Sequence, residues 1–146
     1  HHSDYCLKGI TDERELMHAQ IIRDADKLDN CRVKLETAIE TLLGVTAEQV
    51  GMSEITPEVM RQFKNHKSVL LETRKTMMDY WISYLAYFYD INYKVTYESI
   101  RDNYYVDKLI GRIPYTNPKT RMQMEEIRNE MNLYIQNAIN ENRNQR

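Results

Sequence analysis

Apolar side chains recur every three to four residues along most of this sequence, which is the period of an amphipathic helix. The first such stretch predicts helix over residues 12–43, either as one long helix or as two with a bend near Asn30. Thr11 or Asp12 is a residue type that caps the start of a helix, and Gly44 marks its end. No stretch alternates between apolar and polar residues as a half-buried strand would. The pattern therefore predicts an all-α fold, a compact multi-helix domain.

Further helices are expected after this one. Residues 44–56 read as a connection, and Pro57 directly after a threonine marks the start of a helix that reaches about residue 67. A helix over residues 73–91 is apolar on nearly every side, which is typical of a helix in the middle of a domain. Another helix is expected over residues 96–113.

The last predicted helix begins near Pro118, where a proline follows a capping asparagine. Its apolar residues are spaced alternately by three and four positions: Met124, Ile127, Met131, Tyr134 and Ala138. This seam is coiled-coil-like but short, so we expect it to pack on the body of the domain.

Composition narrows the class of protein. A length of 146 residues is that of one domain, so residues 1–146 are expected to form a single helical domain. Lys and Arg total 20 and Asp and Glu total 22, and this balance argues against nucleic-acid binding. Two cysteines make no disulfide framework, and the most apolar run, over residues 80–89, is shorter than the roughly 20 residues that cross a bilayer. We therefore expect a cytoplasmic protein without a membrane partner.

One segment, residues 21–29, places three carboxylates and two cations on an amphipathic helix. At about 100° per residue, Asp24 falls on the same side as the apolar Leu28. A carboxylate at the border of a buried face must be paired, hydrogen-bonded or bound to a metal. Two interpretations of Asp24 follow: a metal ligand, or an internal ion pair with Arg32 or Arg74.

The run Arg23-Asp24-Ala25-Asp26-Lys27-Leu28-Asp29 resembles the second half of an HD-domain metal-dependent phosphohydrolase. In that family an all-helical domain carries a His, then a His-Asp doublet and then a distant Asp, which together hold one or two divalent metals. The resemblance implies that Asp24 is a metal ligand, and that His1 or His2 is a second one. It extends less specifically through residues 78–81 and 112–118, which look like tail segments of a bacterial subgroup and are expected to serve packing.

The first His and the His-Asp doublet of that family are absent from this sequence, since His18 precedes Ala19 and His66 precedes Lys67. Either the chain is the C-terminal part of a longer protein with a helical extension, or it has lost the metal site. The start at residues 1–3 runs directly into family-like sequence, which favours the first interpretation. We expect this chain on its own to be inactive.

The resemblance implies metal-dependent hydrolysis of a phosphate ester or phosphoanhydride, with a phosphorylated small molecule or nucleotide as substrate. The metal lowers the pKa of a bound water, and the resulting hydroxide attacks phosphorus. A mixed His and carboxylate site suits Mn, Fe, Co, Ni, Mg or Zn. Lys27, one helical turn beyond Asp24, is expected to contact a substrate phosphate; the alternative is a solvent-exposed lysine.

The alternative function is a helical interaction or regulatory module without catalytic activity. It predicts an Asp24 that is paired with an internal arginine, and a Met and Tyr seam exposed on the last helix as the interface of a homodimer. On this interpretation, the remaining histidines need no catalytic or metal-binding role. His18 reads as a hydrogen-bonded core residue, and His66 as a residue at a helix end, where a cation is favourable.

Overall fold

The computed structural model describes residues 12–141, and within this range the chain is helical and contains no strand. The elements in chain order are α1 (Glu13–Glu36), α2 (Ile39–Leu43), α3 (Ala47–Met52), α4 (Pro57–Lys64), the 3₁₀ turn η1 (Leu71–Thr73), α5 (Met77–Ala86), the 3₁₀ turn η2 (Tyr87–Tyr89), α6 (Lys94–Asp102), α7 (Tyr105–Ile110) and α8 (Pro118–Asn140). The prediction of an all-α fold is confirmed for these residues.

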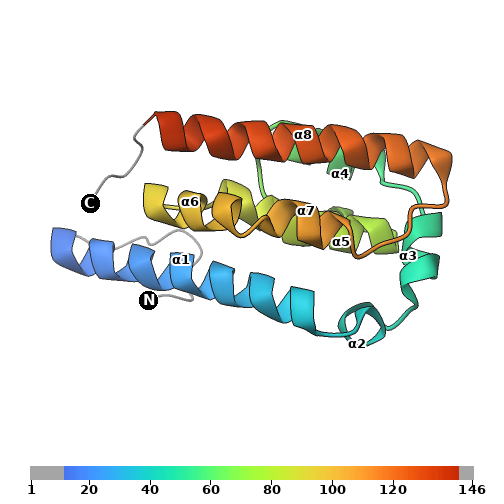
Figure 1. Cartoon of the computed structure of the whole chain (residues 1–146), viewed down its shortest axis with the longest axis horizontal. Coiled ribbons are helices and arrows are strands. Elements are labelled where there is room, and N and C mark those ends of the chain that lie inside the picture. Colours follow the sequence, from blue (N-terminus) through green and yellow to red (C-terminus); the bar gives the residue numbers. More distant parts are fainter. Residues whose placement is uncertain (1–11, 142–146) are drawn as a thin grey trace.

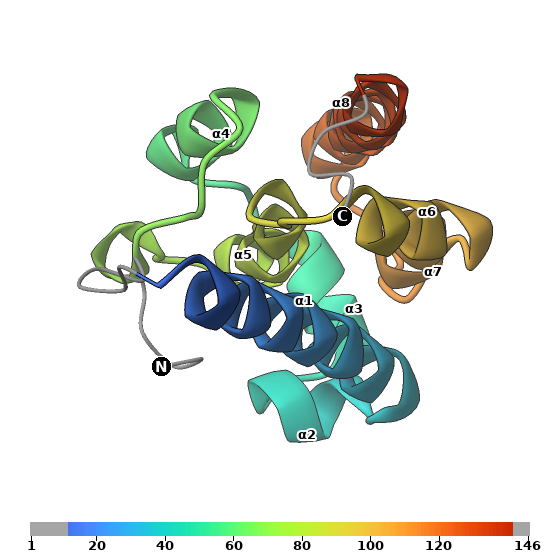
Figure 2. The same ribbon diagram turned by 90° about the vertical axis from the view of Figure 1, so that its left-hand side faces the viewer.

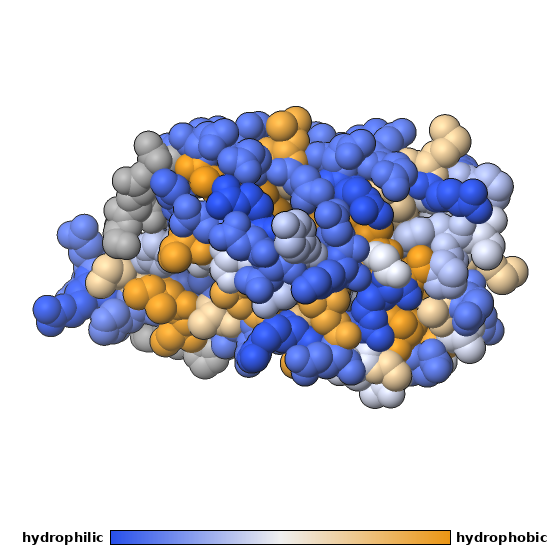
Figure 3. Space-filling view, viewed as in Figure 1, coloured by the Kyte–Doolittle hydropathy of each residue, from blue (hydrophilic) through white to orange (hydrophobic). Residues whose placement is uncertain are grey.

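The two long helices, α1 and α8, run along opposite edges of the molecule, with α5, α6 and α7 between them (Figures 1 and 2). Helix α8 packs on α6 and α7, which in turn pack on α1, while α5 packs on α3 and α4. Most of the face seen in Figure 3 is hydrophilic, and its apolar residues form small separate groups. The apolar side chains are therefore gathered between the helices. No helix of residues 12–141 has the length and apolar character that a bilayer crossing requires.

Helix α5 lies in the middle of the core, as its apolar sequence predicts. Met78, Trp81, Ile82 and Leu85 are fully buried on it. The helix is shorter than expected, because Thr76 and Asp79 form a capping box that starts it at Met77, and the chain then tightens into η2. Burial of these aromatic and aliphatic side chains makes α5 a major contributor to the core.

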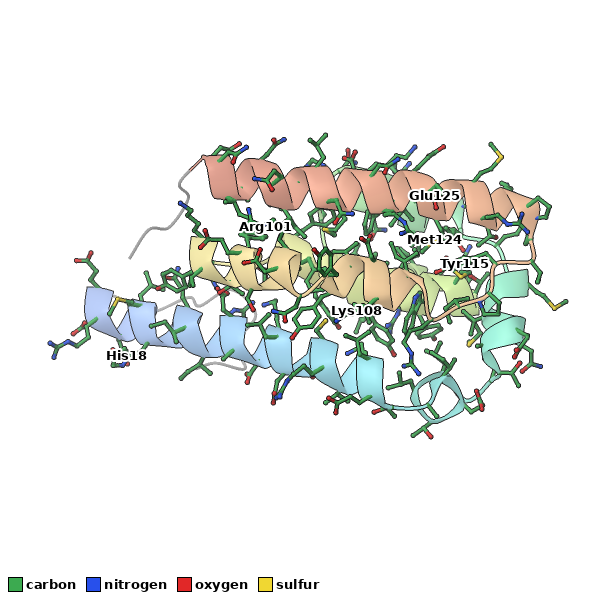
Figure 4. All side chains as sticks on the ribbon, viewed as in Figure 1. His18, Arg101, Lys108, Tyr115, Met124 and Glu125 are labelled. Atoms are coloured by element: carbon green, nitrogen blue, oxygen red, sulfur yellow. The ribbon has the colours of Figure 1, made fainter. Side chains whose placement is uncertain are left out.

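The seam of α8 packs on the body of the domain, as predicted. Met124, Ile127, Met131 and Ala138 are buried, and Figure 4 shows Met124 between α8 and the neighbouring helices. The hydroxyl of Tyr134 donates to the carbonyl oxygen of Tyr89 at 3.4 Å. The alternative expectation of an exposed Met and Tyr seam is therefore wrong, because these side chains face α6 and α7.

The first predicted helix ends earlier than expected. Helix α1 runs without a break through Asn30 and stops at Glu36, and Thr37 has an extended backbone before α2 begins. The guanidinium of Arg112 donates to the carbonyl oxygens of Lys34 and Thr37, which α1 leaves free at its C-terminus. A side chain distant in the sequence thus helps to fix where this helix stops.

Two further boundaries differ from the sequence prediction. The expected connection contains α3, which a capping box between Thr46 and Gln49 starts. A Cβ at Gly51 in this helix would lie 1.9 Å from the carbonyl oxygen of Pro114, so only glycine fits this contact. The predicted helix over residues 96–113 is two helices, because Tyr104 takes a left-handed φ of 56° between α6 and α7.

Candidate functional site

Asp24 lies on the buried side of α1, with 3% of its surface exposed. Its Oδ1 accepts hydrogen bonds from the backbone N–H and the side-chain amide of Asn92, at 2.9 and 3.0 Å. Its Oδ2 accepts from the N–H of Tyr93 at 2.9 Å and the hydroxyl of Thr96 at 2.7 Å. Asp24 therefore joins the middle of α1 to the chain that begins α6.

These four bonds decide how well Asp24 suits a metal. A carboxylate offers about four lone-pair directions, and here each is directed at a donor. Within residues 12–141 no group of three or more His, Cys, Asp or Glu side chains is arranged to hold a metal ion. A metal at Asp24 would therefore have to replace some of these donors, and its further ligands would have to come from outside the described residues. The expected partners His1 and His2 lie outside the described residues, and their role as ligands stays a prediction.

The other interpretation of Asp24, an ion pair with an arginine, is wrong. Arg32 pairs with Asp29 on the exposed side of α1. The guanidinium of Arg74 lies 4.3 Å from the ring centre of Tyr80, in a cation–π contact. Hydrogen bonds from neutral donors satisfy Asp24 instead. His18 is likewise exposed on the outer side of α1 (Figure 4) and is not a core residue.

Two cations lie on a different side of α1, one helical turn apart. Nη2 of Arg23 is 2.9 Å from Oδ2 of Asp90, and Nζ of Lys27 is 3.4 Å from the same oxygen. The side chains of Arg23 and Lys27 are only 12% and 13% exposed, whereas that of Asp90 is 49% exposed. Lys27 is thus not the solvent-exposed lysine of the alternative interpretation. Asp90 directly follows η2, so the pairing brings together residues 67 positions apart.

These three residues line a hollow that we call the Asp90 cleft. Its part next to α1 has a volume of about 380 Å³ and includes the apolar residues 69–71 and the ring of Tyr87. A second part, of about 600 Å³, extends toward the end of α4 and shares Asp90, Ser68 and Leu70 with the first. Figure 2 shows the connecting chain between α4 and η1, in green, running down the side of the molecule toward α1.

The cleft presents two partly buried cations near α1. Arg23 and Lys27 both contact Asp90 there, and Glu72 lines the same part of the cleft. Partly buried cations attract an anion more strongly than cations in water, because the surrounding dielectric constant is lower. Asp26 and Asn30 line a smaller hollow beside the same two cations.

No protein-family model, curated protein or solved structure matches this chain. The resemblance to HD-domain phosphohydrolases therefore rests on the sequence segments that carry it, chiefly residues 23–29.

Proposed function

We propose that the Asp90 cleft binds the phosphate group of a small phosphorylated molecule or nucleotide, as the substrate-binding part of a metal-dependent phosphohydrolase of the HD type. The observation that carries the proposal is the pair of largely buried cations, Arg23 and Lys27, that meet one half-exposed carboxylate. Both cations belong to the same segment of α1 that resembles the HD family.

The two side chains offer complementary contacts to a phosphate. A guanidinium presents a planar fork of donors that matches two phosphate oxygens, and an ammonium acts as a compact point charge. A phosphate monoester carries a charge of about −1.5 to −2 at neutral pH, more than the single charge of Asp90. Since Asp90 is half exposed, it can turn into solvent when a phosphate takes its place.

The rest of the ligand has an apolar surface to contact. Leu70 and Leu71 are exposed, and together with the ring of Tyr87 they line the cleft beside the cations. A small molecule with an organic part would bury these side chains on binding, which inorganic phosphate cannot do. This arrangement supports a phosphorylated organic molecule as the ligand.

The hydrolytic step rests on the resemblance. The ligands that the resemblance implies for this chain are Asp24 and His1 or His2, and a metal held there would supply a hydroxide for hydrolysis of the phosphate. Asp24 would have to give up hydrogen bonds to Asn92, Tyr93 or Thr96 in order to coordinate a metal. The phosphate-binding part of the proposal does not depend on this step.

The test is calorimetric titration of the full chain with phenyl phosphate. We expect Lys27→Ala and Arg23→Ala each to weaken binding about tenfold or more, because each removes a charge-assisted contact. Lys75→Ala is the matched control, since Lys75 is exposed and does not line the cleft. Unchanged affinity in the Lys27 and Arg23 variants, or no binding by the parent chain, would overturn the proposal.

One observation favours the alternative, a helical module without catalysis. The four hydrogen bonds of Asp24 explain its burial without any metal. Release of phosphate from p-nitrophenyl phosphate by the full chain, dependent on added Mn²⁺ and lost on chelation, would exclude that alternative.

A further inference from the structure

The chain that closes the far end of the Asp90 cleft makes an unusual turn. His66 follows α4 with a left-handed φ of 59°, at a position where helices usually carry glycine. Its N–H donates to the carbonyl oxygen of Phe63 at 3.0 Å, and the N–H of Lys67 donates to that of Gln62 at 3.2 Å. The turn sends the next residues away from the axis of α4 and along the cleft.

Contacts with other elements fix the side chain of His66. Its Nε2 lies 2.6 Å from Oε1 of Glu130 on α8. Its ring stacks on Tyr89 at 5.0 Å between ring centres and meets the edge of Tyr134 at 4.9 Å. These contacts hold the turn in place from two sides, which explains why a histidine is tolerated in a conformation that favours glycine.

Gln62 fixes the chain on the other side of the turn. Its side-chain oxygen accepts from the N–H of Leu70 at 2.8 Å, and its amide nitrogen donates to the hydroxyl of Thr73 at 3.2 Å. The stretch over residues 67–69 is therefore anchored at both ends. Lys67 and Ser68 line the larger part of the cleft from this anchored stretch.

The polar side chains of this stretch have no partner among residues 12–141. Lys67 makes no ion pair there, and Ser68 makes no side-chain hydrogen bond. The acids that line the same part of the cleft are already paired: Glu58 with Arg61, and Asp90 with the two cations of α1. An uncompensated ammonium and a free hydroxyl thus face the far end of the cleft.

We propose that Lys67 and Ser68 bind a second anionic group of the ligand whose phosphate is held by Arg23 and Lys27. The proposal rests on the proposed function and names the substrate class: small molecules with two separate anionic groups, such as bisphosphates. The two parts of the cleft share Ser68, Leu70 and Asp90, so one ligand can occupy both. Asp90 lines both parts of the cleft, so the part of the ligand that passes it needs to be without negative charge.

The experiment compares ligands with one and two phosphates by calorimetry on the full chain. The probes are hexyl phosphate and the bisphosphates of ethane-1,2-diol, butane-1,4-diol and hexane-1,6-diol. We expect at least one bisphosphate to bind about tenfold or more tightly than hexyl phosphate, because the second contact forms within the complex. Lys67→Ala should remove this advantage while leaving the affinity for hexyl phosphate unchanged. Ser68→Ala should reduce the advantage, and Lys75→Ala should not affect it.

Two results would overturn the inference. One is equal affinity of hexyl phosphate and all three bisphosphates, and the other is an advantage that persists in Lys67→Ala. Failure of the proposed function gives a different result, since hexyl phosphate would then bind equally well to the parent chain and to Lys27→Ala, or to neither.

Discussion

Asp24 and Asp79 are two buried carboxylates in different parts of the molecule, and each needs hydrogen-bond donors to offset its burial. Asp79 is fully buried, and its oxygens accept from the N–H groups of Thr56, Lys75 and Thr76 and from the hydroxyl of Thr56. Asp24 has the same number of donors, again three N–H groups and one threonine hydroxyl, although one N–H belongs to a side-chain amide. Each carboxylate is thus satisfied by neutral donors, without a cation.

The two sites differ in where these donors come from. Lys75 and Thr76 immediately precede α5, so Asp79 chiefly caps its own helix and ties it to the start of α4. The donors to Asp24 all lie at the start of α6, which is remote in the sequence. Asp79 therefore stabilises local structure, whereas Asp24 holds two distant helices together. The same set of donors thus serves a local cap at one carboxylate and a long-range link at the other.

The largest effect is expected for Asp24→Ala. Tyr93 and Thr96 are buried, so the substitution leaves an N–H and a hydroxyl without a partner where water does not reach. We expect a loss of about 3–4 kcal/mol in the free energy of unfolding, measured by urea denaturation. An unchanged free energy of unfolding would mean that these hydrogen bonds are incidental and that Asp24 is free for other roles.

Asp79→Ala should have a smaller effect, about 2–3 kcal/mol in the same measurement. Its donors Thr56, Lys75 and Thr76 are only partly buried or exposed, so water can replace part of what is lost. The cost that remains comes from the lost cap of α5. A larger loss for Asp79→Ala than for Asp24→Ala would mean that the local hydrogen bonds of Asp79 stabilise the fold more than the long-range hydrogen bonds of Asp24.

The smallest effect is a dependence of stability on pH. Burial raises the pKa of the Asp79 carboxyl, but hydrogen bonds from Thr56, Lys75 and Thr76 outweigh burial, so the pKa lies below its ordinary value of 3.8. The stabilisation is therefore complete above about pH 4 and is lost as the pH falls through the lowered pKa. Urea denaturation between pH 5 and pH 2.5 should show this loss in the parent chain and a weaker one in Asp79→Asn. Equal slopes of the free energy of unfolding against pH in the parent chain and in Asp79→Asn would contradict this prediction.

Local patterns allowed part of this fold to be predicted. Helix α5 is apolar on every face and can only lie in the core, and the seam of α8 has a helical period that needs a packing partner. The start of α4 follows from Thr56 and Pro57, because proline suits the first turn of a helix. Each of these signals is contained within a few neighbouring residues.

Features that depend on distant residues were not predictable. Three contacts join positions that are close only in the folded chain. They are the contact of Arg112 with the end of α1, of Asn92 with Asp24, and of Asp90 with Lys27. The sequence did indicate that Asp24 lies at the border of a buried face of its helix. It gave no sign of the Asp90 cleft, because no single segment contains both of its charged partners.

The connection between α1 and α6 also has a consequence for the order of folding. While the chain is being synthesised, Asp24 emerges long before Asn92, Tyr93 and Thr96, so these hydrogen bonds cannot form until α6 has emerged. Bringing such remote segments together carries a loop-closure cost that helices α2 to α5 reduce by folding first. Among the helices of residues 12–141, α1 is thus expected to be one of the last to find its native position.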